Sequence, residues 1–231
     1  MSNRNNISEA IKDSRKKEIA ARREWVVFGT VKLIVKDFPP SNVSIQDIIQ
    51  ELEEKIPKSF VQNLDVIYIG QFEHLISREV EAVYEDGAIY VSNEQPDEQE
   101  FIESIGHEIA HSVEEIMFQS IYSDGAIEKE FLGKRRRLWS ILNSRGLASD
   151  ADKRQFQKLE YSTEFDTYLY KKVGYPVLTS LTMGLFLSPY GATSLREYFA
   201  NAFESFFLNG EAEYVKHISP VVYNKLIKLV N

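Results

Sequence analysis

The segment His107-Glu108-Ile109-Ala110-His111 combines residue types and a spacing that suit metal chemistry. On a helix, side chains four residues apart share one face, with their Cβ atoms about 5–6 Å apart. His107 and His111 can then bind one zinc ion, at ~2.0–2.1 Å from each ring nitrogen. Glu108 lies between them, where a carboxylate can hold a water molecule at the ion and accept its proton. The motif predicts a zinc hydrolase, most simply a metallopeptidase. The alternative, which the motif favours less, is that the two histidines cap or pack in the helix without metal.

A catalytic zinc site has three protein ligands and keeps its remaining position open. The chain has no cysteine, so the third ligand must be a histidine or a carboxylate. The other two histidines, His74 and His217, stand in no metal-binding pattern. Glu197 is a better candidate, because it lies in a strongly helical, aromatic-rich stretch where a packed carboxylate is costly unless it is paired or bound to metal. The alternative is that Glu197 is an exposed residue favoured by the dipole at a helix start.

Composition limits the classes of partner and compartment. Of the 231 residues, 43% are hydrophobic and 27% are charged, which is typical of a globular protein. The formal net charge of −8 argues against nucleic acid as the main partner. No apolar run approaches the ~20 residues of a membrane helix, and residues 1–23 lack the apolar core of a signal peptide. We therefore expect a cytoplasmic protein. A protein that a virus encodes, or one that is delivered into a host cell, is compatible with this expectation.

The pattern of the remaining chain predicts an α+β fold, in which a small mixed sheet precedes the active-site helix and a mostly helical second half. We expect a helical extension over residues 1–24 and a single domain over residues 25–231. The predicted elements are a strand over 25–35, a helix over 44–56, a strand over 65–70, a hairpin over 79–92, a helix from Asp97 and helices near 127–144, 150–172, 194–208 and from Ser219-Pro220 onward. In zinc peptidases the strand before the active-site helix commonly edges the cleft and pairs with extended substrate. Here that strand is residues 88–92.

Residues 188–203, Ser-Pro-Tyr-Gly-Ala-Thr-Ser-Leu-Arg-Glu-Tyr-Phe-Ala-Asn-Ala-Phe, closely resemble the second active-site segment of the anthrax lethal factor family. The shared pattern is a tyrosine followed by glycine, a threonine two further on, a glutamate seven after the tyrosine, then aromatic-Phe-Ala and a later phenylalanine. The family also includes the secreted Pro-Pro endopeptidases. Residues 102–115 resemble its first motif, and residues 219–231 resemble its terminal helix more loosely.

The resemblance implies a zincin-like fold of the gluzincin type, with zinc held by His107, His111 and Glu197 and with Glu108 as general base. It also implies that Tyr190 donates its hydroxyl to the oxyanion of the tetrahedral intermediate, a role that suits a phenol in a dry site. Asn201 stands where family members often carry an acidic residue. The resemblance implies that it supports a ligand histidine through a hydrogen bond.

The distance between the two motifs departs from the compact members of that family, because residues 112–196, 85 in all, separate His111 from Glu197. We interpret residues of about 127–172 as a helical insert that covers the cleft or binds a protein partner. Its basic run, residues 134–137, is interpreted first as a solvated face and second as a docking patch. Three acidic residues of the insert are rival metal ligands: Glu160, Glu164 and Asp166.

These patterns together predict a zinc-dependent endopeptidase that acts on a protein or peptide substrate. Two alternatives stay open. One is a non-catalytic, zinc-binding structural or regulatory component of a larger assembly, which requires a fourth protein ligand. The other is a regulatory peptidase dedicated to one intracellular partner.

Overall fold

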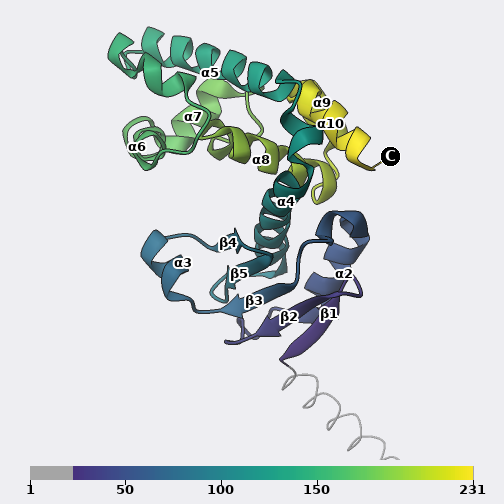
Figure 1. Ribbon diagram of the computed structural model, residues 1–231. Helices are drawn as coiled ribbons and strands as arrows, with labels where there is room; N and C mark the ends of the chain where they lie inside the picture. Colours follow the sequence, from purple (N-terminus) through teal and green to yellow (C-terminus); the bar gives the residue numbers. More distant parts are fainter. Residues whose placement is uncertain (1–22, 231) are drawn as a thin grey trace, which may run out of the picture.

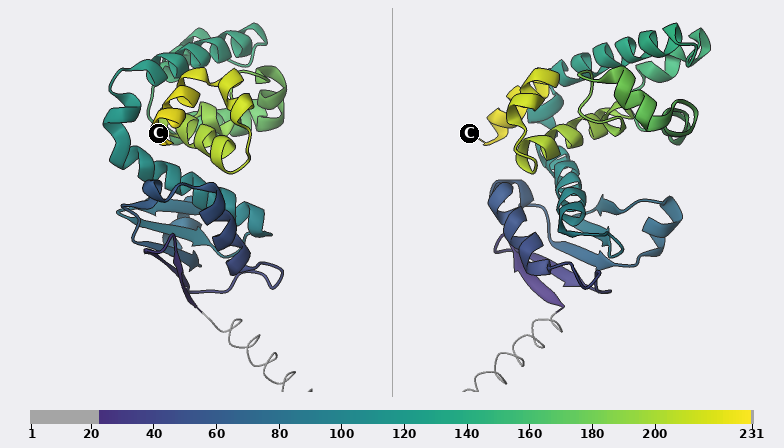
Figure 2. Two further views of the ribbon diagram at one scale, coloured as in Figure 1. Left: turned by 90° about the vertical axis from the view of Figure 1, so that its right-hand side faces the viewer. Right: turned by 180° about the vertical axis from the view of Figure 1, so that it is seen from behind.

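A sheet half and a helical half are joined by one long helix, α4 (Glu98–Tyr122), in the computed structural model. Figure 1 shows α4 running from the sheet into the helical half, and both views of Figure 2 show the two halves at its opposite ends. The structure describes residues 23–230, so nearly all of the predicted extension over residues 1–24 lies outside the described residues. The predicted α+β class, with strands early and helices late, is confirmed.

The sheet is mixed, as predicted, and its strand order is β1-β2-β3-β5-β4. Strands β2, β3 and β5 are parallel, whereas β1 and β4 pair antiparallel at the two edges. The elements of this half are β1 (Glu24–Val27), β2 (Val31–Val35), α2 (Ile45–Lys55), η1 (Lys58–Val61), β3 (Val66–Gly70), α3 (Glu73–Arg78), β4 (Ala82–Glu85) and β5 (Ala88–Ser92).

The predicted single strand over residues 25–35 is wrong, because a tight turn divides it into β1 and β2. Phe28 and Gly29 both have positive φ angles, of 54° and 75°, which turn the chain back on itself. The Phe28 amide donates to Glu53 Oε1 at 2.5 Å, a contact that fixes the turn against α2. Only the glycine signalled this turn in a run of β-forming residues.

The prediction that residues 88–92 form the edge strand is also wrong. Strand β5 lies between β3 and β4, so β4 is the edge. The predicted hairpin causes this arrangement: Asp86 and Gly87, with φ angles of 48° and 81°, fold β4 onto one side of β5, and parallel β3 occupies the other side. At this side of the sheet the edge strand is therefore β4, and the other edge is β1.

The helical half contains α5 (Ala126–Ser144), η2 (Asp150–Gln157), α6 (Thr163–Thr167), η3 (Tyr168–Gly174), α7 (Tyr175–Thr182), η4 (Tyr190–Ala192), α8 (Leu195–Phe207), α9 (Ala212–Ile218) and α10 (Pro220–Val230). The predicted continuous helix over 150–172 is wrong, because residues 158–162 are not helical. Ser149 caps η2 and Ser162 caps α6, so each serine starts a separate short element. Asp97 and Pro220 begin α4 and α10 as predicted.

Helix α4 packs between the two halves through a fully buried apolar face, formed by Phe101, Ile102, Ile105, Ile109 and Val113. Leu208, the residue that ends α8, packs on Gly106 of α4, where a Cβ atom would lie 2.3 Å from Leu208 Cδ1. Helix α5 joins the same core, since the rings of Phe131 and Tyr198 lie 5.4 Å apart. The glycine before His107 thus lets α8 lie close to the histidine pair.

Replacing Gly106 with alanine should lower the free energy of unfolding by about 1–3 kcal/mol, because the new methyl group overpacks the α4–α8 contact. Gly133→Ala is the matched control within α5, where the nearest atom to a Cβ is Arg136 Nη2 at 3.9 Å. This control should gain up to about 1 kcal/mol from helix propensity. Denaturant unfolding measures both variants, and a Gly106→Ala protein as stable as Gly133→Ala would contradict the close packing.

Candidate metal centre

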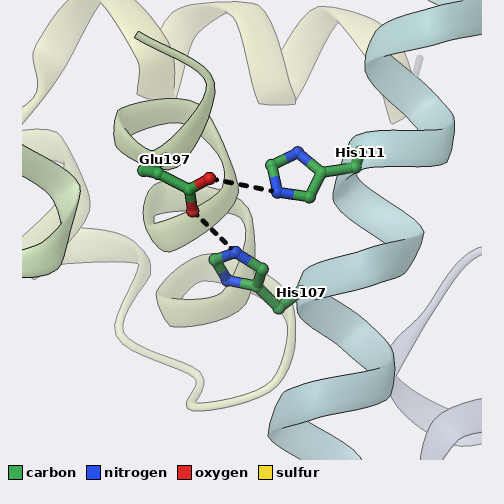
Figure 3. Close-up of side chains that lie close together, drawn as sticks. All are labelled: His107, His111 and Glu197. Carbon is green, nitrogen blue, oxygen red and sulfur yellow. Dashed lines mark hydrogen bonds and ion pairs between the residues drawn. The ribbon is translucent and has the colours of Figure 1, made fainter. Parts of the chain in front are cut away.

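Three side chains from two helices converge on one point. Figure 3 shows His107 and His111, one turn apart on α4, facing Glu197 of α8. Glu197 Oε2 lies 2.9 Å from His107 Nε2, and Glu197 Oε1 lies 3.6 Å from His111 Nε2. One donor atom from each residue lies within 4.8 Å of the other two, so the group can hold a metal ion. The structure brings together the three residues predicted as metal ligands.

Glu197 reaches the histidines from the first turn of α8, three residues after the cap residue Ser194. The Ser194 hydroxyl accepts a hydrogen bond from the Glu197 amide at 3.2 Å and caps the helix. In a capping box the glutamate at this position would reach back to the cap, but here the carboxylate points to α4. Glu197 is only 9% exposed, so the alternative of an exposed helix-start residue is wrong.

Two further carboxylates hold the far nitrogens of the imidazole rings. Glu114 Oε2 lies 2.8 Å from His111 Nδ1, and Glu204 Oε2 lies 3.4 Å from His107 Nδ1. A carboxylate on one ring nitrogen fixes the tautomer and directs the other nitrogen toward a metal. These partners were not predicted from the sequence, although Glu114 follows His111 by three residues and Glu204 follows Glu197 by seven, and both spacings place side chains on one helical face.

Glu114 is 4% exposed and is held by two other donors. It accepts a hydrogen bond from the Tyr122 hydroxyl, and Arg196 Nε lies 3.4 Å from its Oε2 atom. A buried carboxylate is tolerated only where its oxygens are satisfied in this way. The His111 ring is therefore oriented by a carboxylate that is itself fixed.

Asn201, predicted to support a ligand histidine, is placed differently. Its Oδ1 atom accepts a hydrogen bond from the Ser188 hydroxyl, and it packs where a Cβ on Gly191 would lie, 3.1 Å away. Asn201 thus steadies the segment around Tyr190, while the contact with His107 is made by Glu204, one turn further along α8.

The electrostatics of the group favour charged imidazoles in the metal-free protein. Burial lowers the pKa of His107, but hydrogen bonds to Glu197 and Glu204 outweigh it and raise this pKa to about 10. Burial also opposes the charge on His111, yet hydrogen bonds to Glu114 and Glu197 raise its pKa to about 9. For Glu197, burial raises the pKa, but the two histidines bring it well below its usual range.

The group lies in a cleft of about 960 Å³ between the two halves of the protein. One wall is the edge strand β4 with the end of α3, and the other is formed by residues of the segments 159–163 and 190–197. His107, Glu108 and His111 also line the cleft, between the two walls. The segment 159–163 comes from the predicted insert.

The two predicted catalytic residues line the same cleft. Glu108 is 8% exposed, and its Oε2 atom accepts a hydrogen bond from the Tyr84 amide of β4 at 2.7 Å. Tyr190 begins the short turn η4, and its ring centroid lies 6.2 Å from that of His107. Burial raises the pKa of Tyr190, and the charge on Glu197 raises it further, so the phenol keeps its proton.

The rival ligands lie outside the three-residue group found among residues 23–230. His74 packs edge-on against Tyr90, with ring centroids 4.8 Å apart, and His217 is exposed near the end of α9. Asp166 accepts hydrogen bonds from the hydroxyls of two tyrosines. Glu160 lines the cleft, and Glu164 lies in the first turn of α6.

Comparisons with protein-family models, with curated proteins and with solved structures find no match to this chain. The resemblance to the lethal factor family therefore stays a prediction from the two motifs. Within residues 23–230, every helix is too short or too polar to cross a membrane.

The loss of zinc affinity on removing each carboxylate should depend on whether that carboxylate binds the metal or orients a histidine. Glu197→Gln should lower it by more than about 100-fold, because a ligand is lost, whereas Glu114→Gln and Glu204→Gln should each lower it by about 10–100-fold. The matched control is Glu103→Gln, because Glu103 is a half-buried residue of α4 that bonds only to Gln99 among the hydrogen bonds described. Competition with a chromophoric chelator measures these affinities, and full zinc affinity in Glu197→Gln would remove Glu197 from the ligand set.

Zinc binding should also depend steeply on pH. The folded metal-free protein keeps His107 and His111 protonated to about pH 9, above their ordinary pKa of 6.5, so zinc must displace about two protons. Zinc affinity should therefore rise as pH rises from 6.5 to 8. Over the same range the free energy of unfolding of the metal-free protein should fall, since the folded state binds more protons than the unfolded state.

Calorimetry in buffers of different ionisation enthalpy counts the protons released. Binding without proton release at pH 7 would contradict the charged state of the two histidines.

Proposed function

We propose that this protein is a zinc-dependent endopeptidase with a zincin-like fold, related to the anthrax lethal factor family. The observation that carries the proposal is the convergence of His107, His111 and Glu197 in a cleft that also contains Glu108 and Tyr190. These residues come from two motifs far apart in the sequence and line one cleft, and this juxtaposition supports the proposal.

The donor set suits zinc, because two imidazoles and one carboxylate form a common set of ligands in catalytic zinc sites. When bound there, zinc supplies a Lewis acid that polarises a carbonyl group and makes water acidic enough to act as a nucleophile. A structural zinc site is normally closed by a fourth protein ligand. The group among the described residues has three, which favours catalysis over the non-catalytic alternative.

Glu108 is the proposed general base. Its Oε2 atom is held by the Tyr84 amide, so the carboxylate is fixed at the wall of the cleft while its other oxygen is not used by this bond. In this position the carboxylate accepts a proton from the attacking water and transfers it to the leaving amine. Tyr190 donates its hydroxyl to the negative charge that develops on the carbonyl oxygen of the scissile bond.

The edge strand β4 supplies a template for an extended peptide. The Ser92 amide donates to the Glu81 carbonyl, whereas the Tyr84 amide points away from β5 toward Glu108. Because bonding direction alternates along an antiparallel strand, Ala82 and Tyr84 direct their backbone groups outward. A substrate strand can pair with the outward groups that Glu108 does not use.

The length of the cleft favours an endopeptidase. Tyr84 and Arg196 line both the main cleft and a second hollow of about 460 Å³, so the depression continues past the metal group. A peptide that extends on both sides of the scissile bond fits such a groove better than a chain end does.

Glu108→Gln should abolish turnover while zinc still binds, because the amide keeps the shape of the side chain but cannot accept the proton. We expect kcat to fall by at least about 10²–10⁴-fold. The readout is digestion of a peptide library, with and without chelator, alongside metal analysis of each protein. Glu103→Gln is the control, and turnover by Glu108→Gln equal to that of the control would refute Glu108 as the base.

A further inference from the structure

The basic run of α5, residues 134–137, is only partly a solvated face. Arg136 and Arg137 are exposed, but Arg135 is 1% exposed and Lys134 is half-buried. Lys134 Nζ donates to the carbonyls of Leu185 and Ile218. The interpretation of the whole run as solvated is therefore wrong, and the buried guanidinium of Arg135 has a task within the fold.

All hydrogen bonds described for Arg135 go to backbone carbonyls. Its Nη1 atom donates to Ala192 O at 2.5 Å and to Thr193 O at 3.0 Å. Its Nη2 atom donates to Gln155 O, in η2, at 2.6 Å. The guanidinium thus joins two segments that lie far apart in the sequence, one of which follows Tyr190 directly.

Aromatic rings enclose the guanidinium on its apolar faces. The Cζ atom lies 4.0 Å from the ring centroid of Phe165 and 5.3 Å from that of Phe131. Among the salt bridges of residues 23–230 no carboxylate pairs with Arg135. A buried cation without a counter-ion is costly, and hydrogen bonds to carbonyl oxygens offset this cost only in part. Its bonds are better explained by the geometry that they impose than by their stabilising effect.

The segment that Arg135 holds is the turn that carries Tyr190. The Thr193 amide and hydroxyl both donate to the Tyr190 carbonyl, at 2.9 and 2.7 Å. The Ala192 amide donates to the Pro189 carbonyl at 3.1 Å. Each of these hydrogen bonds joins residues within the turn, whereas the guanidinium of Arg135 connects the end of the turn to α5.

We infer that Arg135 is a positioning residue for Tyr190, because it fixes the turn of residues 190–193 and so holds the phenol beside His107 in the cleft. This inference rests on the proposed peptidase function. Arginine suits the task better than lysine, since its planar fork can bond to both segments at once. The Ser188–Asn201 hydrogen bond holds the entry of the same segment, so the turn is fixed at both ends.

A double-mutant cycle tests whether Arg135 acts through Tyr190. Tyr190→Phe should lower kcat by about 10²–10³-fold, the usual loss for one oxyanion donor. Arg135→Met should lower kcat by about 10–100-fold, as expected for a misplaced catalytic group, with KM and zinc content nearly unchanged. The double variant should be no slower than Tyr190→Phe alone. Losses that multiply would overturn the inference, because they would mean that Arg135 acts independently of the phenol.

Two further variants separate positioning from general destabilisation. Leu138→Ala removes a fully buried side chain one turn along α5 and should lower stability without changing kcat per folded molecule. Arg135→Lys keeps the charge and most of the volume, so it serves if Arg135→Met does not fold. It should still lose kcat because one ammonium group cannot replace the fork.

Hydrogen exchange tests whether Arg135 holds the turn of residues 190–193, and it requires no measurement of activity. In Arg135→Met, the amides of Ala192 and Thr193 should exchange faster, while amides of α4 around His111 and the zinc stoichiometry stay unchanged. Unchanged exchange at Ala192 and Thr193 would overturn the inference whether or not the wild-type protein cleaves peptides. Absence of chelator-sensitive cleavage by the wild-type protein counts against the proposed function alone.

Discussion

The burial of the Glu197 carboxylate between two imidazoles is the interaction on which the rest of the site depends. It requires α8 to lie against α4, and Gly106 permits this approach by leaving room for Leu208. A carboxylate in such a place is costly unless positive charge or a metal ion meets it. The two histidines supply that charge in the metal-free protein, and the same donor atoms suit a divalent ion. Helix packing and metal chemistry are therefore linked at one point.

Polar contacts around this point hold each side chain of the proposed site from a second side. Glu114 and Glu204 orient the imidazoles, the Tyr84 amide holds Glu108, and Arg135 holds the turn of Tyr190. These partners come from the edge of the sheet, from α4 and α8, and from α5. The site is thus assembled from both halves of the protein, which explains why the cleft lies between them.

The features predicted correctly from the sequence are local in origin. The His-Glu-x-x-His spacing, the helix starts at Asp97 and near residue 194 and the hairpin over residues 79–92 each depend on residues a few positions apart, and the structure contains all of them. Glu197 was found because its surroundings are aromatic and because the segment resembles a known motif.

The features that were missed depend on tertiary contacts. Pattern alone could not reveal that β3 occupies one side of β5 and leaves β4 as the edge. Charge composition made Arg135 look solvated, since burial of a cation shows only when its carbonyl partners are in place. Asn201 was assigned by analogy, whereas the glutamate one turn later reaches the histidine. The most direct measurement of the central claim is anomalous diffraction from crystals of the zinc-loaded protein. The account predicts one ion at ~2.0–2.2 Å from His107 Nε2, His111 Nε2 and a Glu197 oxygen, with the remaining position open to the cleft. An ion bound elsewhere, or one closed off by a fourth protein ligand, would contradict it.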